Sequence, residues 1–189
     1  METKFMAVMG PSGVGKSTIM HELQNMDPRF ILIKTHVTRP LRPGETDRVS
    51  LTLPQLKSMR RRHEVLQINH IYSSYYAALP ARPIREALSS GMFPMCDYKV
   101  PFAPALKEEL SGDLFCVYLL PPDFGAIRER MGKSWGKANE ARIEEDRLEI
   151  ESLDTKYAGL IDLKIVSEEG QIPRVAADIC RAYLRSLKS

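Results

Sequence analysis

Apolar runs alternate with helix-like patterns along this chain. Leu114 to Leu120 is an almost unbroken apolar run, typical of a strand buried on both faces of a parallel sheet. From Lys16 to Met26 the apolar residues recur at helical spacing, and Asp27-Pro28 ends the pattern. By the same criteria we expect strands at Lys4–Met9, Phe30–Val37, Arg48–Leu53, Glu64–Ile71, 92–97 and Ile161–Val166, and helices from Leu53 and at 81–90, 102–110, 121–131, 140–157 and 172–187. This order of elements predicts an α/β fold with a mostly parallel sheet.

Composition adds limits on the class of protein. The 189 residues are 43% hydrophobic and 27% charged, which suits one domain with a core and excludes a disordered or fibrous chain. A net charge of +3 is too small to indicate nucleic-acid binding. No targeting segment or membrane-length apolar run is visible, so we expect a cytoplasmic protein. Cys96 and Cys116 lie in apolar runs and are interpreted as buried free thiols.

The segment Gly10–Ser17 reads GPSGVGKS and matches G-x-x-x-x-G-K-[ST], with a predicted strand before it and a predicted helix after it. In such a loop the backbone N–H groups and the helix N-terminus bind phosphate oxygens. Lys16 is placed to reach the β- and γ-phosphates, and the Ser17 hydroxyl to bind Mg²⁺. The predicted ATP-binding residues are Gly10, Pro11, Ser12, Gly13, Val14, Gly15, Lys16, Ser17 and Thr18. A glycine-rich turn without a ligand is the alternative.

Two classes of nucleotide-binding protein remain to be separated. A GTPase switch carries D-x-x-G and N-K-x-D, and neither motif occurs in the 189 residues. A small-molecule kinase needs arginines to hold the acceptor and to neutralise the transferred phosphoryl group. Arg39 and Arg42 lie three residues apart in a proline-containing loop, an arrangement that suits a phosphate dianion. Without the phosphate loop, a solvated basic loop would explain the pair equally well.

Together these motifs resemble the guanylate kinase family, whose acceptor-phosphate loop reads T-R-x-x-R-x-G-E. The resemblance covers nearly the whole chain: Ser73–Ala77 is similar to the family's G-N-Y-Y-G, and Leu119–Pro122 to its P-P turn after a buried strand. It implies a P-loop fold of the guanylate kinase type in one domain, 1–189. The expected parts are a core (1–34, 91–130 and 143–189), an acceptor-binding lobe (about 35–90) and a short lid (about 131–142).

The resemblance also implies roles for individual residues. Arg39, Arg42 and Tyr76 would hold the acceptor's monophosphate, with Thr35 a weaker candidate and Glu45 bracing the loop. Asp97 would lie near Mg²⁺ and Lys16, as a metal-binding residue together with Ser17. Arg130 and Arg142 would close over the transferring phosphoryl group. The implied reaction moves the γ-phosphoryl of ATP to a small monophosphate, GMP by family default, with Mg²⁺ as cofactor.

The chain departs from the family where guanine is read. The family has a glutamate, a Ser or Thr and an aspartate where this sequence has Gln67, Ala78 and Lys99. The tyrosine expected after Glu45 is missing, and the lid is about three residues shorter, with Lys133 in place of an arginine. Lys99 would suit an acceptor that carries negative charge or a carbonyl group.

Other functions therefore stay open. One is a kinase for a phosphorylated sugar, as in the related ribose bisphosphate phosphokinases. Another is a non-catalytic guanylate-kinase-like binding domain, although such domains usually have a degraded P-loop and this one is intact. We expect a monomer or a homodimer, with no nucleic-acid or membrane partner.

Overall fold

A five-stranded parallel sheet lies at the centre of the computed structural model, which describes residues 3–125, 127–129 and 140–188. The strand order is β2-β7-β1-β8-β9. In chain order these strands are β1 (Phe5–Met9), β2 (Phe30–Leu32), β7 (Phe93–Asp97), β8 (Leu114–Leu120) and β9 (Leu163–Val166). All four pairings between neighbours are parallel. The expected α/β fold with a mostly parallel sheet is confirmed.

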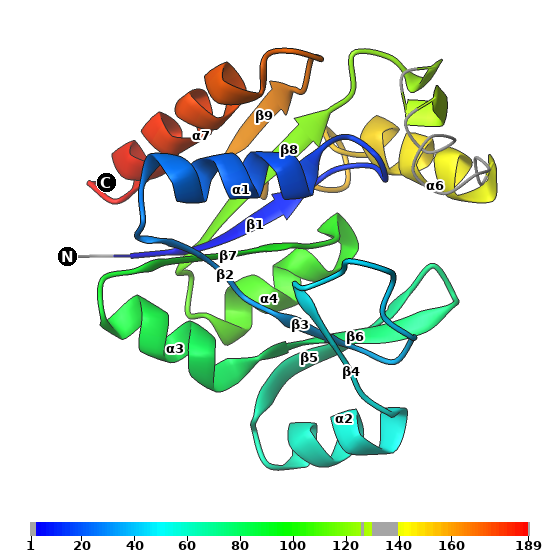
Figure 1. Ribbon diagram of the computed structural model, residues 1–189, viewed down its shortest axis with the longest axis vertical. Coiled ribbons are helices and arrows are strands. Elements are labelled where there is room, and N and C mark those ends of the chain that lie inside the picture. Colours follow the sequence, from blue (N-terminus) through cyan, green and yellow to red (C-terminus); the bar gives the residue numbers. More distant parts are fainter. Residues whose placement is uncertain (1–2, 126, 130–139, 189) are drawn as a thin grey trace.

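Helices cover both faces of this sheet (Figure 1). On one face lie α1 (Lys16–Met26) and α7 (Ile172–Ser186), and on the other lie α3 (Ala81–Ser89) and α4 (Ala103–Glu109), which follows the short 3₁₀ helix η1 (Val100–Phe102). Side chains of a strand alternate between the faces, so Met6 and Val8 of β1 pack toward α1 and α7 while Phe5, Ala7 and Met9 pack toward α3 and α4. Strand β1, in the middle of the sheet, is therefore fully buried. The core thus fixes the position from which the next loop starts.

A second, four-stranded sheet extends from one end of the core (Figure 1). Its order is β4-β3-β6-β5, with β3 and β4 parallel and the other pairs antiparallel. The strands are β3 (Thr35–Val37), β4 (Arg48–Ser50), β5 (Val65–Ile71) and β6 (Tyr75–Pro80). Helix α2 (Leu53–Arg61) packs on this sheet and begins at a capping box formed by Thr52 and Gln55. These elements lie within the range expected for the acceptor-binding lobe.

The expected single strand at Phe30–Val37 is wrong, because the structure divides it between the two sheets. Ile33 N–H donates to the carbonyl of Met95 in the parallel sheet (2.9 Å), whereas Thr35 N–H donates to the carbonyl of Asp47 beside β4 (3.1 Å). The residues form one continuous β-favouring run, so nothing local marks the division. The hydrogen-bonding partners decide it.

One strand and the ends of two other elements also differ from the sequence prediction. Strand β6 was not predicted, because its residues do not alternate between apolar and polar. Strand β4 ends at Ser50 and not at Leu53. Helix α6 (Glu140–Glu151) ends before the expected Tyr157, since Leu153 and Tyr157 enter the core from a series of turns. The expected helix at 121–131 lies partly outside the described residues, as does most of the expected lid.

Cys96 and Cys116 are buried free thiols, as expected. None of the described helices is long and apolar enough to cross a membrane.

Candidate active site

The loop between β1 and α1 has the backbone of a phosphate-binding nest. Gly10, Gly13 and Gly15 all adopt positive φ, and a Cβ on Gly10 would lie 2.5 Å from the carbonyl oxygen of Leu119. Helix α1 starts at Lys16, so its free N–H groups and its positive dipole end point toward this loop. The glycines of the motif are thus required by chain geometry.

Lys16 lies close to the end of β7. Its Nζ donates to the carbonyl oxygens of Gly10 and Pro11 (2.8 Å each) and lies 3.9 Å from Oδ1 of Asp97. Burial lowers the pKa of Lys16, although the nearby Asp97 carboxylate favours the charged form. A cation placed this way is suited to an anionic ligand, because new charge contacts would offset its poor solvation.

The donor set beside Lys16 fits Mg²⁺. The Ser17 hydroxyl and the Asp97 carboxylate are hard oxygen ligands, and both residues line the same cavity. Among the described residues, no group of three or more His, Cys, Asp or Glu could hold a metal ion by itself. Mg²⁺ usually binds through one or two protein oxygens, phosphate and water, so Ser17 and Asp97 are sufficient protein ligands for it.

The loop between β3 and β4 is organised by one carboxylate. Glu45 accepts from both terminal nitrogens of Arg39 (2.8 and 2.5 Å) and from the backbone N–H of Arg42 (3.0 Å). The hydrogen bonds from Arg39 lower the pKa of Glu45 to about 2. The Arg39 guanidinium also lies over the ring of Tyr75, 5.2 Å from its centroid. Glu45 therefore braces the loop, and the side chains of Arg39 and Arg42 both reach a common cavity.

One cavity of about 740 Å³ joins the phosphate loop to the arginine loop. Its lining includes Lys16 and Ser17 on one side, and Arg39 and Arg42 on the other. Thr35 and Asp97 lie between them. Residues far apart in the sequence thus meet around a space large enough for two ligands.

Arg48, at the start of β4, was not singled out by the sequence pattern. It is largely buried, and its guanidinium contacts Asp97 Oδ2 (3.2 Å), Asp47 Oδ2 (3.0 Å) and Thr35 Oγ1 (3.4 Å). Burial by itself lowers the pKa of Arg48, but Asp97 and Asp47 outweigh it and raise the pKa. A lone arginine in an alternating strand gives no sequence signal, because two of its three partners, Thr35 and Asp97, come from β3 and β7.

The candidate acceptor residues of β5 and β6 are placed differently from expectation. Tyr75, not Tyr76, lines the large cavity, and Tyr76 stacks on His70 with centroids 4.5 Å apart. Asn69 lines the cavity and donates to the Tyr98 hydroxyl (2.9 Å). The hairpin register causes this, since Asn69 pairs with Ala77 and Ile71 with Tyr75 on the face toward the cavity.

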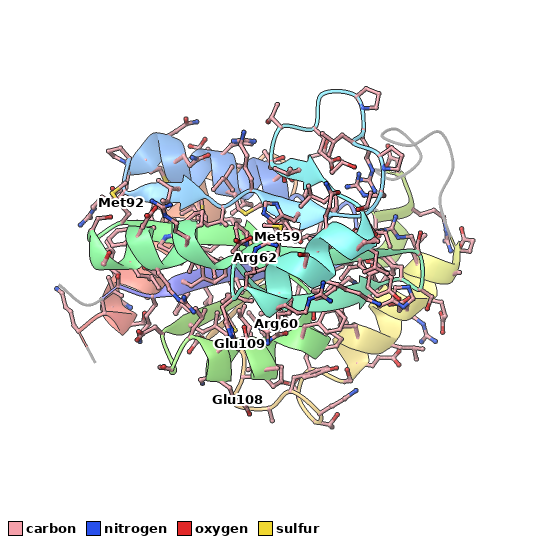
Figure 2. The ribbon with its side chains drawn as sticks, turned by 90° about the horizontal axis from the view of Figure 1, so that it is seen from below. Met59, Arg60, Arg62, Met92, Glu108 and Glu109 are labelled. Atoms are coloured by element: carbon pink, nitrogen blue, oxygen red, sulfur yellow. The ribbon has the colours of Figure 1, made fainter. Side chains whose placement is uncertain are left out.

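Gln67 lies along a second, shallower groove between β5 and α4. Its Oε1 accepts from the Tyr98 hydroxyl (3.3 Å). The groove also contains the ion pair between Arg60 and Glu109 (2.6 Å), whose two side chains meet in Figure 2. A register shift between Val65 and Ile68 lies at this point of the strand, and the alternation of apolar and polar residues does not reveal it.

Lys99 lines the large cavity, but its ammonium group already has partners. It donates to Asp146 Oδ1 (2.7 Å) and lies 3.7 Å from Glu149 Oε2. These carboxylates both lie on helix α6, within the chain, and the expected role of Lys99 beside an anionic acceptor stays a prediction. Arg142, also on α6, lines the cavity and places its guanidinium 4.0 Å from the centroid of the Tyr72 ring. Arg130 and Lys133 lie outside the described residues.

Known proteins resemble this chain in both sequence and fold. The family model described as guanylate kinase matches residues 2–171. The guanylate kinases of Zymomonas mobilis and Carboxydothermus hydrogenoformans are 34% and 32% identical over 66% and 67% of this chain. The chain spans 58% and 62% of the length of these two relatives.

Among solved structures, guanylate kinase from Anaplasma phagocytophilum superposes on the whole chain, over 88% of its own length, with a TM-score of 0.78 and 16% identity. A shikimate kinase from Acinetobacter baumannii superposes over 97% of this chain and 94% of its own, with a TM-score of 0.52 and 15% identity. These structures share the fold. With the sequence match over residues 2–171, we conclude that the chain belongs to the guanylate kinase family.

Proposed function

We propose that this protein is an ATP-dependent phosphotransferase that moves the γ-phosphoryl group of ATP to a small phosphorylated acceptor, with Mg²⁺ as cofactor. The observation that carries the proposal is the single cavity lined at one end by the phosphate loop and at the other by Arg39 and Arg42. In-line transfer needs the two phosphates face to face, and this arrangement supplies a binding group for each.

The chain contributes positioning and charge. Lys16 would exchange its contacts with the carbonyl oxygens of Gly10 and Pro11 for phosphate oxygens of ATP. The Ser17 hydroxyl and the Asp97 carboxylate would hold Mg²⁺, which neutralises phosphate charge when bound. Arg142 lines the same cavity and would stabilise the transferring group, and we propose the same role for Arg130.

Arg39 and Arg42 would bind the monophosphate of the acceptor, because guanidinium groups bind phosphate through paired hydrogen bonds. The carboxylates of Glu45, Asp47 and Asp97 that line this cavity all face arginines. For the rest of the acceptor the lining offers Asn69 and Tyr98 among apolar side chains such as Ala78. Guanine presents N–H donors and is best read by a carboxylate, so we infer weak selection for GMP.

A phosphorylated sugar is the second candidate acceptor, because Asn69 and Tyr98 line the cavity with polar groups that can form hydrogen bonds with sugar hydroxyls. The Arg48 guanidinium is already paired with Asp47 and Asp97, so it adds no unpaired charge for the acceptor. A non-catalytic binding domain is the third reading, and the intact Gly10–Ser17 loop argues against it. We expect the reaction in the cytoplasm, carried out by a monomer or a homodimer.

The test is product analysis with ATP–Mg²⁺ and a panel of GMP, AMP and ribose phosphates. We expect ADP and a phosphorylated product with at least one acceptor, and none with Lys16→Ala. A GMP preference above about a hundredfold, which is about 2.7 kcal/mol, would refute the altered selectivity. Nucleotide binding without transfer to any member of the panel would favour the binding domain.

A further inference from the structure

A buried polar network connects the phosphate loop to two other parts of the molecule. At its centre is Asp146 of helix α6, which is fully buried (0% exposed). Asp146 Oδ2 accepts the backbone N–H of Ser12 (2.8 Å), and Oδ1 accepts from the Tyr72 hydroxyl (3.0 Å) and the Lys99 ammonium (2.7 Å). The Tyr72 hydroxyl is also 3.1 Å from Oγ of Ser12. A carboxylate in the middle of helix α6 thus holds the tip of the phosphate loop.

Tyr72 reaches this network from the turn between β5 and β6. Both Tyr72 and Ser73 have a φ of 48°, a left-handed conformation that is unfavourable for residues with a side chain. The Lys99 ammonium and the Arg142 guanidinium both lie over the Tyr72 ring, 4.3 and 4.0 Å from its centroid. The turn therefore adopts a costly backbone conformation that delivers one phenol to the phosphate loop and to two cations.

Lys99 is a cation of the network and lies between two carboxylates, Asp146 and Glu149. Burial by itself lowers the pKa of Lys99, but Glu149, Tyr72 and Asp146 outweigh burial and raise it, so the ammonium form persists. That cation offsets the negative charge of Asp146 beside a loop that has to accept anionic phosphates. Asp146 can thus supply a strong hydrogen-bond acceptor to Ser12 N–H without making the site repel its ligand.

We propose that Asp146 and Tyr72 are positioning residues that hold the Ser12 segment of the phosphate loop in its nucleotide-binding conformation, with Lys99 as the counter-ion. The inference rests on the proposed function, since the nucleotide is the ligand that reports it. Neither residue touches the transferred group. Both act through Ser12, and Tyr72 also acts through Arg142. The network links the loop, the turn after β5 and helix α6.

The test compares two double variants that both remove the ion pair, with ADP–Mg²⁺ as the probe. Both variants remove Lys99 from Glu149 in the same way, so a difference between them reports the residue at position 146. In Lys99→Met with Asp146→Asn, the amide oxygen still accepts from Ser12 N–H. In Lys99→Met with Asp146→Leu, that N–H loses its acceptor. By calorimetry we expect affinity close to wild type for the first and about tenfold weaker for the second.

Equal ADP–Mg²⁺ affinity of the two double variants would overturn the proposal, because a merely structural ion pair predicts that result. Glu151→Gln is the matched control, since Glu151 is an exposed carboxylate on the same helix, and it should bind as wild type. If the leucine variant does not fold, Tyr72→Phe decides: it keeps the ring but loses the hydroxyl, and unchanged affinity overturns the proposal. Failure of the wild-type protein to bind ADP–Mg²⁺ would refute the proposed function itself, and this inference with it.

Discussion

Glu45→Gln is the sharpest test of the acceptor-phosphate loop. The substitution keeps the size and one oxygen of the side chain but removes its charge and one acceptor. In the protein the carboxylate accepts three hydrogen bonds, two from the Arg39 guanidinium and one from Arg42 N–H. The variant is left with a single acceptor oxygen for these three donors.

The size of the effect follows from those contacts. Loss of a hydrogen bond to a charged group costs about 1.5–3 kcal/mol. The Arg39 and Glu45 side chains are 16% and 12% exposed, so solvent weakens the pair only partly. We take the loss of one such bond as the estimate, because an amide oxygen in the place of Oε2 still accepts from Arg39 Nη1 and from Arg42 N–H. If this whole free energy is lost from acceptor binding, because the loop becomes disordered, the KM for the acceptor rises roughly 10- to 150-fold.

The assay is initial-rate kinetics with ATP and the acceptor varied in turn. We expect the KM for the acceptor to rise and the KM for ATP to stay within about twofold, because Glu45 contacts the arginine loop and not the phosphate loop. Glu64→Gln is a matched control: Glu64 also accepts from an arginine through both oxygens (2.8 Å each), but on the exposed surface of the same lobe. Equal increases of both KM values would refute the reasoning, since Glu45 would then support folding and not recognition.

Three further predictions follow from single contacts. Lys16→Ala should lower turnover by orders of magnitude without lowering the urea midpoint, because burial already disfavours this charge; wild-type turnover would contradict the proposed role. Lys99→Asp should lower the free energy of unfolding by about 3–5 kcal/mol, measured in urea, because it places a third carboxylate beside Asp146 and Glu149; unchanged stability would show that the ion pair does not form. The pKa of Glu45 is lowered from 4.5 to about 2, so its stabilising contribution is complete above pH 4.5 and is lost as the pH falls toward 2. The difference in unfolding free energy between wild type and Glu45→Gln should shrink over that range.

The sequence alone was sufficient for features that depend on neighbours in the chain. The glycine spacing of Gly10–Ser17 dictates its own backbone, and the apolar run Leu114–Leu120 matches β8 residue for residue. The T-R-x-x-R-x-G-E loop contains both Arg39 and its brace Glu45, so its internal ion pair follows from local geometry. The fold class and the family could be predicted for the same reason.

Only the tertiary structure decided which side chains from distant segments meet. Phe30–Val37 is one run in the sequence, yet hydrogen bonding to Met95 and to Asp47 divides it between two sheets. Beside a register shift in β5, Gln67 lies along the second, shallower groove, whereas Asn69 lines the large cavity. Contacts of this kind are set by strand register and packing, which composition and spacing do not encode.

Lys99 and Asp146 show most clearly which contacts the sequence alone does not predict. They are 47 positions apart, and the sequence analysis gave Lys99 an acceptor as its partner and gave Asp146 no role. In the fold they form a buried pair at the phosphate loop, because Lys99 follows the end of β7 and Asp146 of α6 lies beside Ser12. A buried charge needs a partner, but the sequence does not say which residue that partner is.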